Sequence, residues 1–411
     1  MYFFYNLITN LVFIISPLIF IYRILKGKED PKRFQEKLCI YSKKKIRNKV
    51  WIHAASIGEL MSVIPIINKF EKDNKIKSII ITTTTLSSAR IFSKLKFRKT
   101  FHVYFPLDTN FLTKKFISFW KPELAIFVDS EIWPNMYKNL EINKIPIIIL
   151  NARMVKKTLN RWKIFPNFAK QVFSKITLAM PQNLETSKYL KQLNVKNIKI
   201  AGNLKYYGEK DKKDLDNKIL KNKFKNFNIW CAASTHDNEE IFIGKLHKNL
   251  KRYGRKLITI IIPRHINRSS KIIDDMKEIG LNTIIHSSNQ KIKKNTDIYL
   301  VDSYGISSKF YNLTNVTFVG GSLVAHGGQN PLEPARLGNY IINGPYVSNF
   351  REIYSYLNKI KISSKTSSIL EIEKIIIKKI NKKNNKQYIN KINKIGEQIL
   401  DKNLFYINKY L

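Results

Sequence analysis

Short runs of apolar residues alternate with longer stretches of helical spacing along most of the chain. The short runs are rich in β-branched and aromatic residues, as buried strands are. They occupy residues 50–54, 78–83, 102–105, 124–129, 146–150, 176–180 and 198–201. Strands separated by helices are typical of a parallel, doubly wound α/β sheet. The pattern therefore predicts one such domain over residues 26–208.

This alternation stops at a charged and polar segment and then starts again. Residues 209–225 lack a strand pattern, and we interpret them as a linker. Further strands are expected at residues 228–232, 256–262, 297–301, 316–319 and 340–342. From Ser363 on, Lys, Ile and Asn recur at helical spacing, which favours closing helices. We expect a second α/β domain over residues 226–411, so that two doubly wound domains face a central cleft where ligands bind.

The first 25 residues form an apolar segment of their own. No charged residue precedes Arg23, and the uncharged stretch is about as long as a helix that spans a bilayer. Basic residues such as Lys26 follow it, which favours a cytoplasmic main body. Asn10 and Pro17 weaken an ideal span, so a helix lying in the membrane interface, or buried, is the alternative. A cleavable signal fits less well, because no positive charge precedes the apolar run. Residues 1–25 are expected to be a single membrane anchor.

The chain is strongly basic. It has 73 Lys and Arg against 30 Asp and Glu, a formal net charge of +43. Such an excess favours phosphates, nucleic acid or anionic lipid surfaces. The basic residues are spread along the chain rather than gathered with aromatic residues, which argues against a nucleic-acid site and favours anionic lipid. The two cysteines show no metal-ligand spacing, and the chain lacks the HExxH, GxxxxGK(S/T) and GxGxxG motifs, so we expect no metal and no cofactor.

Acidic residues follow two of the expected strands in the first domain. Ser56-Ile57-Gly58-Glu59 comes after the first strand, and Asp129-Ser130-Glu131 follows the fourth. One interpretation is structural, because Ser-x-x-Glu is a capping box that satisfies the start of a helix. The other is catalytic: an ionised Glu59 at a helix N-terminus could act as a general base. Carboxylates at the ends of different strands of one sheet favour a shared site.

Two segments of the second domain contain candidates for ligand binding. Arg264 in Ile262-Pro263-Arg264-His265 could hold a phosphate with its planar guanidinium group, or could simply be solvated. Gly320-Gly321-Ser322 follows a strand, and glycines allow backbone amides to approach a ligand closely. In Asn330-Pro331-Leu332-Glu333, Asn330 could cap a short helix and Glu333 could bind a ribose.

Taken together, these motifs resemble the 3-deoxy-D-manno-octulosonic acid (Kdo) transferases, and the resemblance extends over nearly the whole chain after the anchor. The matching pieces are His53–Glu59, Glu131–Asn135, Asn151–Arg153, Gly202–Lys205, Ala233–His236, Ile262–His265, Gly320–Ser322, Asn330–Pro334, Gly344-Pro345 and Asn349-Phe350. The resemblance implies the GT-B fold of two Rossmann-like domains. It further implies an inverting, metal-independent transfer of Kdo from CMP-Kdo to the lipid A precursor, lipid IV(A), at the cytoplasmic face of the inner membrane.

The resemblance also assigns roles to individual residues. Glu59 would be the general base, and Glu131 and Lys205 would stabilise the transition state. The residues expected to contact CMP are Pro263, Arg264, Tyr304, Gly305, Ile306, Asn330, Pro331, Leu332 and Glu333. Further donor or acceptor contacts are expected from Ser56, Gly58, Ser234, His265, Gly321 and Ser322. Ile306 replaces a glutamate that is usual in the family, so only backbone contacts are expected from the segment around it.

Two other functions fit part of this pattern. A GT-B enzyme of envelope assembly that uses a UDP-sugar would share the architecture. A non-catalytic basic protein that binds membranes or nucleic acid would explain the charge. The second alternative does not explain the glycine-rich and Asn-Pro-Leu-Glu segments of the second domain.

Overall fold

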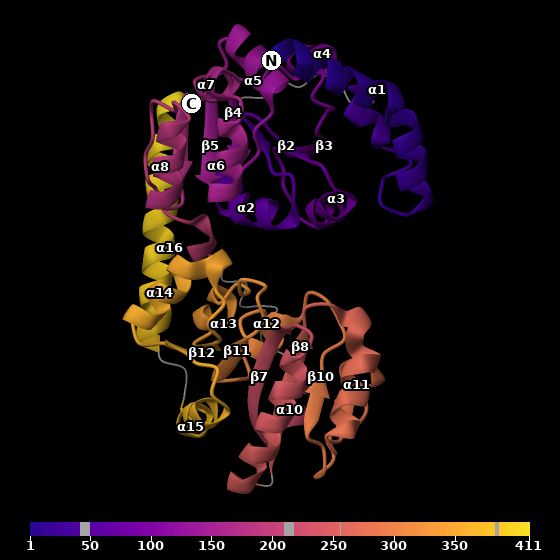
Figure 1. Ribbon diagram of the computed structural model, residues 1–411, viewed down its shortest axis with the longest axis vertical. Helices are drawn as coiled ribbons and strands as arrows, with labels where there is room; N and C mark the ends of the chain where they lie inside the picture. The colour runs from indigo at the N-terminus through magenta and orange to yellow at the C-terminus, as the bar shows by residue number, and fades with distance from the viewer. Residues whose placement is uncertain (42–49, 209–217, 255, 383–385) are drawn as a thin grey trace. The chain divides into compact units, whose positions relative to one another are not determined.

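The computed structural model describes residues 1–41, 50–208, 218–254, 256–382 and 386–411. It divides into two compact units. The first comprises Met1–Tyr207 together with Ile395–Leu411, and the second comprises Gly208–Lys394. Each is an α/β unit built on a parallel sheet, so the predicted fold class is confirmed (Figure 1).

The sheet of the first unit has six parallel strands in the order β3-β2-β1-β4-β5-β6. The strands are β1 Val50–His53, β2 Ile79–Thr83, β3 Thr100–Tyr104, β4 Leu124–Val128, β5 Ile147–Ala152 and β6 Leu178–Pro181. The chain moves outward from β1 to β3 and then returns to place β4 on the other side of β1. This order is that of a doubly wound nucleotide-binding domain, whose ligands bind where the strand order reverses. In this unit the reversal lies between β1 and β4.

Helices cover both faces of this sheet, because both faces of its strands are apolar. Trp51 belongs to one buried cluster and its neighbour Ile52 to the other, as alternate positions of a strand require. The helices of this unit are α1 Tyr2–Leu25, α2 Ile57–Lys72, α3 Leu86–Ser93, α4 Asn110–Trp120, α5 Pro134–Ile142, α6 Lys156–Lys163, α7 Pro166–Phe173 and α8 Leu184–Gln192, with the 3-10 helices η1 Phe34–Leu38 and η2 Leu204–Tyr206.

The second unit contains a seven-stranded parallel sheet in the order β13-β12-β11-β7-β8-β10-β9. The strands are β7 Asn228–Thr235, β8 Leu257–Pro263, β9 Thr283–Ile285, β10 Ile298–Leu300, β11 Val316–Val319, β12 Tyr340–Asn343 and β13 Ser363–Lys365. The α-helices are α9 Lys218–Phe224, α10 Glu239–Leu250, α11 Ser269–Glu278, α12 Ser307–Tyr311, α13 Leu332–Arg336, α14 Arg351–Lys359, α15 Ile369–Lys379 and α16 Lys386–Ile407, which ends in the first unit. The 3-10 helices beyond η2 are η3 Lys251–Tyr253, η4 Ile266–Arg268, η5 His286–Ser288, η6 Ser348–Phe350 and η7 Asn408–Tyr410.

Several expectations from the sequence differ from this structure. Of the predicted strand at residues 198–201, only Ile198 forms an isolated bridge, to Ala179 of β6. The linker predicted at 209–225 is a helix in its second part, where α9 buries Leu220 and Phe224; residues 209–217 lie outside the described part of the chain. The predicted second domain, 226–411, includes 17 C-terminal residues that pack with the first unit instead. Leu400 and Ile407 of α16 are buried in the same cluster as the core of the first sheet, which explains this placement.

Candidate active site

The carboxyl ends of β1 and β4 frame a polar pocket in the first unit. It encloses about 450 Å³ and is lined by Ser56, Gly58, Glu59, Asp129, Ser130, Arg153, Val155, Thr158 and Lys205. The pocket lies at the reversal of strand order, where ligands bind in doubly wound sheets. The pocket therefore brings together five residues singled out from the sequence, namely Ser56, Gly58, Glu59, Asp129 and Lys205.

Glu59 belongs to the first turn of α2 and forms a variant of the predicted capping box, in which its carboxylate accepts from the amide of Ala55 rather than from that of the N-cap residue Ser56. Ser56 is the N-cap residue, and its hydroxyl accepts a hydrogen bond from the Glu59 amide at 3.4 Å. The same hydroxyl donates to Glu59 Oε1 at 2.8 Å, and the Ala55 amide donates to Glu59 Oε2 at 2.8 Å. These contacts hold the carboxylate at the wall of the pocket. Capping and exposure to a substrate are thus compatible for this side chain.

The surroundings of Glu59 make it a weaker acid than an ordinary glutamate. Burial raises its pKa, and the negative charge of Glu131 raises it further, to about 7. The hydrogen bonds from Ser56 and Ala55 act in the opposite direction, with a smaller effect. The helix N-terminus favours the ionised form, as expected from the sequence, but desolvation outweighs it. A carboxylate with this pKa is suited to accept a proton near neutral pH.

Glu131 lies beside the pocket rather than in its lining. Its Oε2 accepts a hydrogen bond from Trp133 Nε1 at 2.9 Å and lies 3.2 Å from His53 Nε2. His53 is fully buried and stacks on Phe105, with a ring separation of 3.9 Å. These contacts immobilise Glu131, and its charge acts on Glu59.

Two cationic side chains of the pocket act on Asp129. Burial raises the pKa of Asp129, whereas the positive charges of Lys205 and Arg153 lower it. Asn151 links the segments that carry these cations, because its Oδ1 accepts a hydrogen bond from the Leu204 amide at 3.0 Å. Asn151 itself has a left-handed backbone, with φ of 53°. The pocket therefore combines a candidate base with basic groups that could bind a phosphate.

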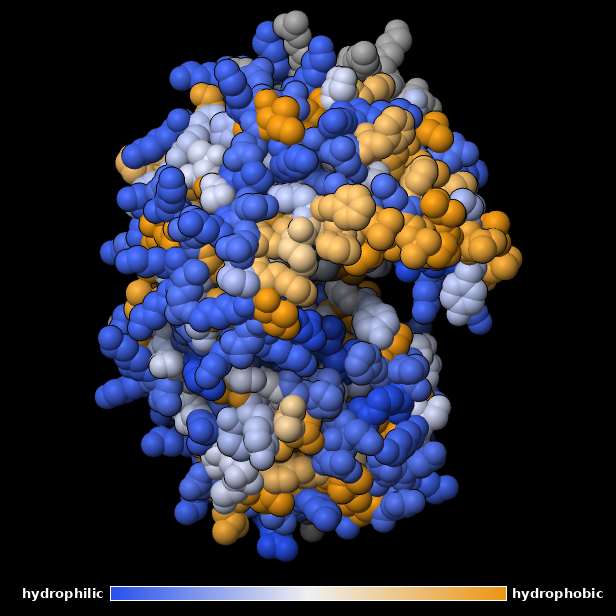
Figure 2. Space-filling view, turned by 45° about the horizontal axis from the view of Figure 1, so that its top comes forward, coloured by the Kyte–Doolittle hydropathy of each residue, from blue (hydrophilic) through white to orange (hydrophobic). Residues whose placement is uncertain are grey.

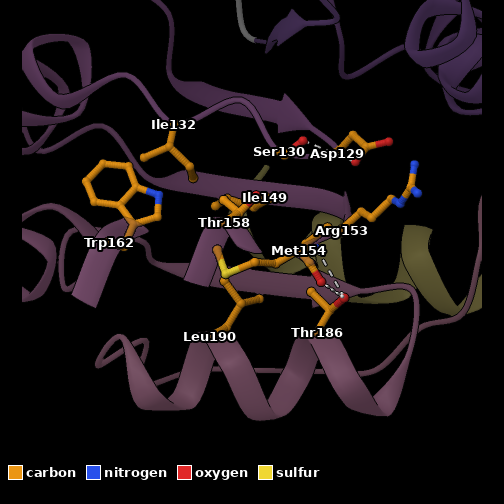
Figure 3. Close-up of a pocket in the computed structure, with 11 residues that line it drawn as sticks. Asp129, Ser130, Ile132, Ile149, Arg153, Met154, Thr158, Trp162, Thr186 and Leu190 are labelled. Atoms are coloured by element: carbon orange, nitrogen blue, oxygen red, sulfur yellow. Dashed lines mark hydrogen bonds between the residues drawn. The ribbon is translucent and has the colours of Figure 1, made fainter. Parts of the chain in front are cut away.

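A smaller pocket of about 110 Å³ adjoins the polar one (Figure 3). Asp129, Ser130, Arg153 and Thr158 line both pockets. The remaining lining of the small pocket is mostly apolar and consists of Ile132, Ile149, Ala152, Met154, Trp162, Thr186 and Leu190. The sequence motifs did not predict this pocket, because its lining comes from four separate stretches of the chain, within residues 129–132, 149–154, 158–162 and 186–190.

In the second unit, the remaining candidates lie at the carboxyl edge of the sheet. Ser234 belongs to the end of β7, Pro263 ends β8, and Arg264 and His265 follow it. The segment of Tyr304, Gly305 and Ile306 follows β10, and that of Gly321 and Ser322 follows β11. Because β11, β7, β8 and β10 are neighbours in one parallel sheet, these segments share one edge. The Arg264 amide donates to Thr235 O at 3.0 Å, while the Arg264 side chain is exposed.

Glu239, which the motifs did not single out, organises the glycine-rich turn. This residue is only 1% exposed. Its carboxylate accepts hydrogen bonds from four backbone amides, those of His236, Gly321, Ser322 and Leu323, at 2.7–3.0 Å. A Cβ atom on Gly320 would lie 2.7 Å from Glu239 Oε2 and 2.5 Å from Ser234 O, so only glycine fits there. The sequence feature that could have identified Glu239 is its position: it is an acidic residue in the first turn of α10, directly after strand β7.

Three histidines gather beside this turn. His236 stacks on His326 with ring centroids 4.3 Å apart, and His265 lies edge-on at 6.1 Å. Burial lowers the pKa of His236 to about 4, assisted by the charges of His326, His265 and nearby arginines. The neutral His236 ring also lies 3.2 Å from Gln329 Nε2. The cluster and Arg264 provide several donors for an anionic ligand.

The Asn330–Glu333 segment forms the start of α13. The Asn330 side chain accepts a hydrogen bond from the Leu332 amide, at 3.1 Å, but α13 begins one residue later than predicted and its N-cap residue is Pro331 rather than Asn330. Pro331 and Leu332 are buried, whereas Glu333 is exposed to solvent. Desolvation raises the pKa of the Glu333 carboxyl, while the exposed part of the residue leaves it open to a ligand. Across the described ranges, no group of three or more His, Cys, Asp or Glu residues is arranged to hold a metal ion.

Comparisons with known proteins identify the family of the chain. The family model described as 3-deoxy-D-manno-octulosonic-acid transferase (kdotransferase) matches residues 32–207. The 3-deoxy-D-manno-octulosonic acid transferase of Haemophilus influenzae is 31% identical over 406 residues, covering 96% of this chain and 94% of that protein. The corresponding protein of Rickettsia bellii is 31% identical over 412 residues, covering 97% of this chain and 98% of that protein.

Solved structures extend the comparison to the fold. The UDP-GlcNAc 2-epimerase of Neisseria meningitidis, bound to UDP-GlcNAc, superposes with a TM-score of 0.55 at 14% identity, covering 87% of this chain and 99% of that one. At this identity the likeness concerns the fold alone. Sequence identity over nearly the full length carries the assignment: the chain belongs to the Kdo transferase family and is a glycosyltransferase.

Proposed function

We propose that this chain transfers Kdo from CMP-Kdo to lipid IV(A), the lipid A precursor, at the cytoplasmic face of the inner membrane. The observation that carries the proposal is the pocket at the carboxyl ends of β1 and β4. There, a glutamate with a pKa of about 7 lies beside Lys205 and Arg153. A phosphorylated sugar acceptor requires a base for its hydroxyl and cations for its phosphate, and this pocket contains both.

In the proposed reaction, a glucosamine 6-hydroxyl of the acceptor attacks the anomeric carbon of Kdo. Glu59 accepts the hydroxyl proton as the new C–O bond forms. The bond between that carbon and the phosphate oxygen of CMP breaks, and CMP leaves with the electron pair. Attack from the face opposite CMP inverts the configuration. This single displacement requires no metal ion.

The other residues have distinct roles in this proposal. Lys205 and Glu131 stabilise the transition state, and the charge of Glu131 also adds to the rise in the pKa of Glu59 that burial causes. In the second unit, Arg264 binds the phosphate of CMP and Glu333 binds its ribose. The amides around Gly321 and the backbone of Tyr304–Ile306 approach the nucleotide closely. Preorganised donors of this kind act where charge develops.

Incubation of the purified protein with CMP-Kdo and lipid IV(A), followed by mass spectrometry of the lipid, tests this function. The expected product is heavier by one or two Kdo units, and the mass counts them. A UDP-sugar transferase is the second candidate, because the fold also matches proteins that bind UDP-GlcNAc. CMP should inhibit the reaction and UDP should not. An unchanged lipid mass would refute the proposal.

Replacing the exposed Arg264 should weaken donor binding specifically. A charge-assisted hydrogen bond contributes about 1.5–3 kcal/mol, so Arg264→Ala should weaken CMP affinity by about tenfold to a hundredfold. Arg264→Lys keeps the charge but lacks the planar fork, and should restore part of the affinity. Calorimetric titration with CMP measures both variants without turnover. Equal CMP affinities for the unsubstituted protein and both variants would show that Arg264 does not bind the donor.

The pKa of Glu59 predicts how the transfer rate depends on pH. A general base must be deprotonated, so kcat/KM should rise as the pH increases through about 7 and then level off. The Ser56 hydroxyl lowers the pKa of Glu59. Ser56→Ala should therefore move the midpoint of the profile to higher pH. A midpoint that stays in place in this variant would show that another group controls the rate.

A further inference from the structure

Helix α1 exposes a continuous apolar face. Its large apolar side chains that are open to solvent are Phe3, Phe4, Leu7, Ile8, Leu11, Val12, Phe13, Ile14, Ile15, Leu18, Ile19, Ile21, Tyr22 and Leu25. Figure 2 shows hydrophobic surface gathered in a band at the upper right, over this helix. An apolar patch of this extent marks an interaction surface.

The opposite side of α1 contacts the protein and contains most of the polar residues of the helix. Tyr2, Tyr5, Asn6 and Thr9 are partly protected, and Ser16 is buried, as is Phe20. These positions recur at spacings of three, four and seven residues and so lie on one stripe. A helix surrounded by lipid would not need such a stripe. The pattern is that of an amphipathic helix with one side on the protein.

Contacts secure α1 to the first unit near both of its ends. Near the N-terminus, the Tyr5 hydroxyl donates to the buried Asp108 at 2.7 Å, and the Tyr2 ring meets Phe168 edge-on at 5.1 Å. Near the C-terminus, Phe20 packs on Phe34 at 5.6 Å. Figure 1 shows the helix passing along the outside of the first unit. A 24-residue helix is about 36 Å long. If it spanned a bilayer, one end would lie about 30 Å from the domain surface, and its contacts would be lost.

A second exposed apolar site adjoins the start of α1. Ile164 and Phe165 form the corner between α6 and α7 and are exposed, with Arg161 and Lys163 immediately before them. Phe168, on the first turns of α7, is the residue on which Tyr2 and Tyr5 pack. The corner is therefore continuous with the N-terminal end of α1. Helix α6 also supplies Thr158 and Trp162 to the pockets of the candidate active site.

We propose that α1 does not span the membrane but lies in its cytoplasmic interface, and that Ile164 and Phe165 are a second point of contact. The occupant of this apolar face is a bilayer rich in anionic phospholipid. Apolar side chains bordered by Arg161, Lys163 and the basic residues after α1 match its acyl chains and its charged surface. In this orientation α6 leads from the membrane surface to the pocket. Only this last inference, that a lipid acceptor enters along α6, rests on the proposed function.

Depth measurements along α1 distinguish the two orientations. Leu7, Ile14 and Ile21 are one heptad apart on the exposed face, and each can be replaced singly by cysteine for a fluorescent label. The native Cys39 and Cys231 are buried, so labelling is selective, and the unsubstituted protein is the control. In phosphatidylglycerol vesicles, nitroxide lipids should quench all three labels at one shallow depth, about 5–10 Å below the head groups. A deep label at position 14 between shallow ones at 7 and 21 would overturn the proposal, as would no quenching at all.

Vesicle flotation tests the second contact. The double variant Ile164→Glu, Phe165→Glu should require about tenfold more anionic lipid for half-maximal flotation, because two apolar contacts become charged. Ile219 of the second unit is an apolar residue that is even more exposed, and Ile219→Glu should float normally. Normal flotation of the double variant would overturn this contact. Flotation involves no Kdo transfer, so failure of the proposed reaction would leave this result interpretable.

Discussion

The variant Glu59→Gln should lose almost all transferase activity while remaining folded. The glutamine oxygen can still accept the Ala55 amide hydrogen bond, and its amide group can still pair with Ser56, so the start of α2 should persist. Glutamine cannot accept the proton of an attacking hydroxyl. Loss of a general base reduces rates by about a hundredfold to ten-thousandfold. The decrease should appear in kcat, measured from the formation of Kdo-containing lipid.

Two control variants separate catalysis from capping. Glu185 also lies on the first turn of a helix in this unit but outside the pockets, so Glu185→Gln should transfer Kdo normally. Ser56→Ala removes the cap and should cost about 0.5–2 kcal/mol of stability, with much of the activity retained at high pH. If Glu59→Gln were as active as Glu185→Gln, the carboxylate would be a cap only.

The strand pattern of the sequence was sufficient to predict both sheets, because their central strands are buried on both faces and are nearly continuous apolar runs. Strands β9 and β13 were not predicted. Each has three residues and lies at a sheet edge, and Ser363–Lys365 carries no apolar side chain. The C-terminal end of α16 was assigned to the wrong unit for another reason. Its helical spacing indicates an apolar face but does not identify the core on which that face packs.

Much of the candidate site also followed from the sequence, since parallel strands bring their carboxyl ends to one edge. That rule groups Glu59 with Asp129, and Arg264 with Gly321. It does not specify hydrogen bonds between distant segments. Glu239 accepts hydrogen bonds from amides more than 80 positions away, and no motif in the sequence indicates that these two segments interact. The raised pKa of Glu59 could likewise not be predicted from the sequence, because desolvation depends on how the folded chain packs around the carboxyl group.

The variant Glu239→Ala should destabilise the second unit strongly. It would leave four backbone amides without their acceptor, those of the buried Gly321 and Ser322 and of the partly buried His236 and Leu323, and each unsatisfied buried group costs about 1–3 kcal/mol. Partial relaxation and water entry reduce the sum, so we expect a loss of about 3–5 kcal/mol in the free energy of unfolding. Urea denaturation of the full chain, followed by circular dichroism, measures it.

Hydrogen exchange locates the damage and distinguishes Glu239 from an ordinary surface carboxylate. In Glu239→Ala, the amides of Gly321, Ser322 and Leu323 should exchange much faster, because their hydrogen bonds to the carboxylate are gone. CMP affinity should fall with them, since these amides form the turn beside Arg264. Glu278→Gln on the exposed side of α11 should change stability by less than about 0.5 kcal/mol. If Glu239→Ala were as stable as Glu278→Gln, the glycine-rich turn would hold its shape without the carboxylate, through the Gly320 packing alone.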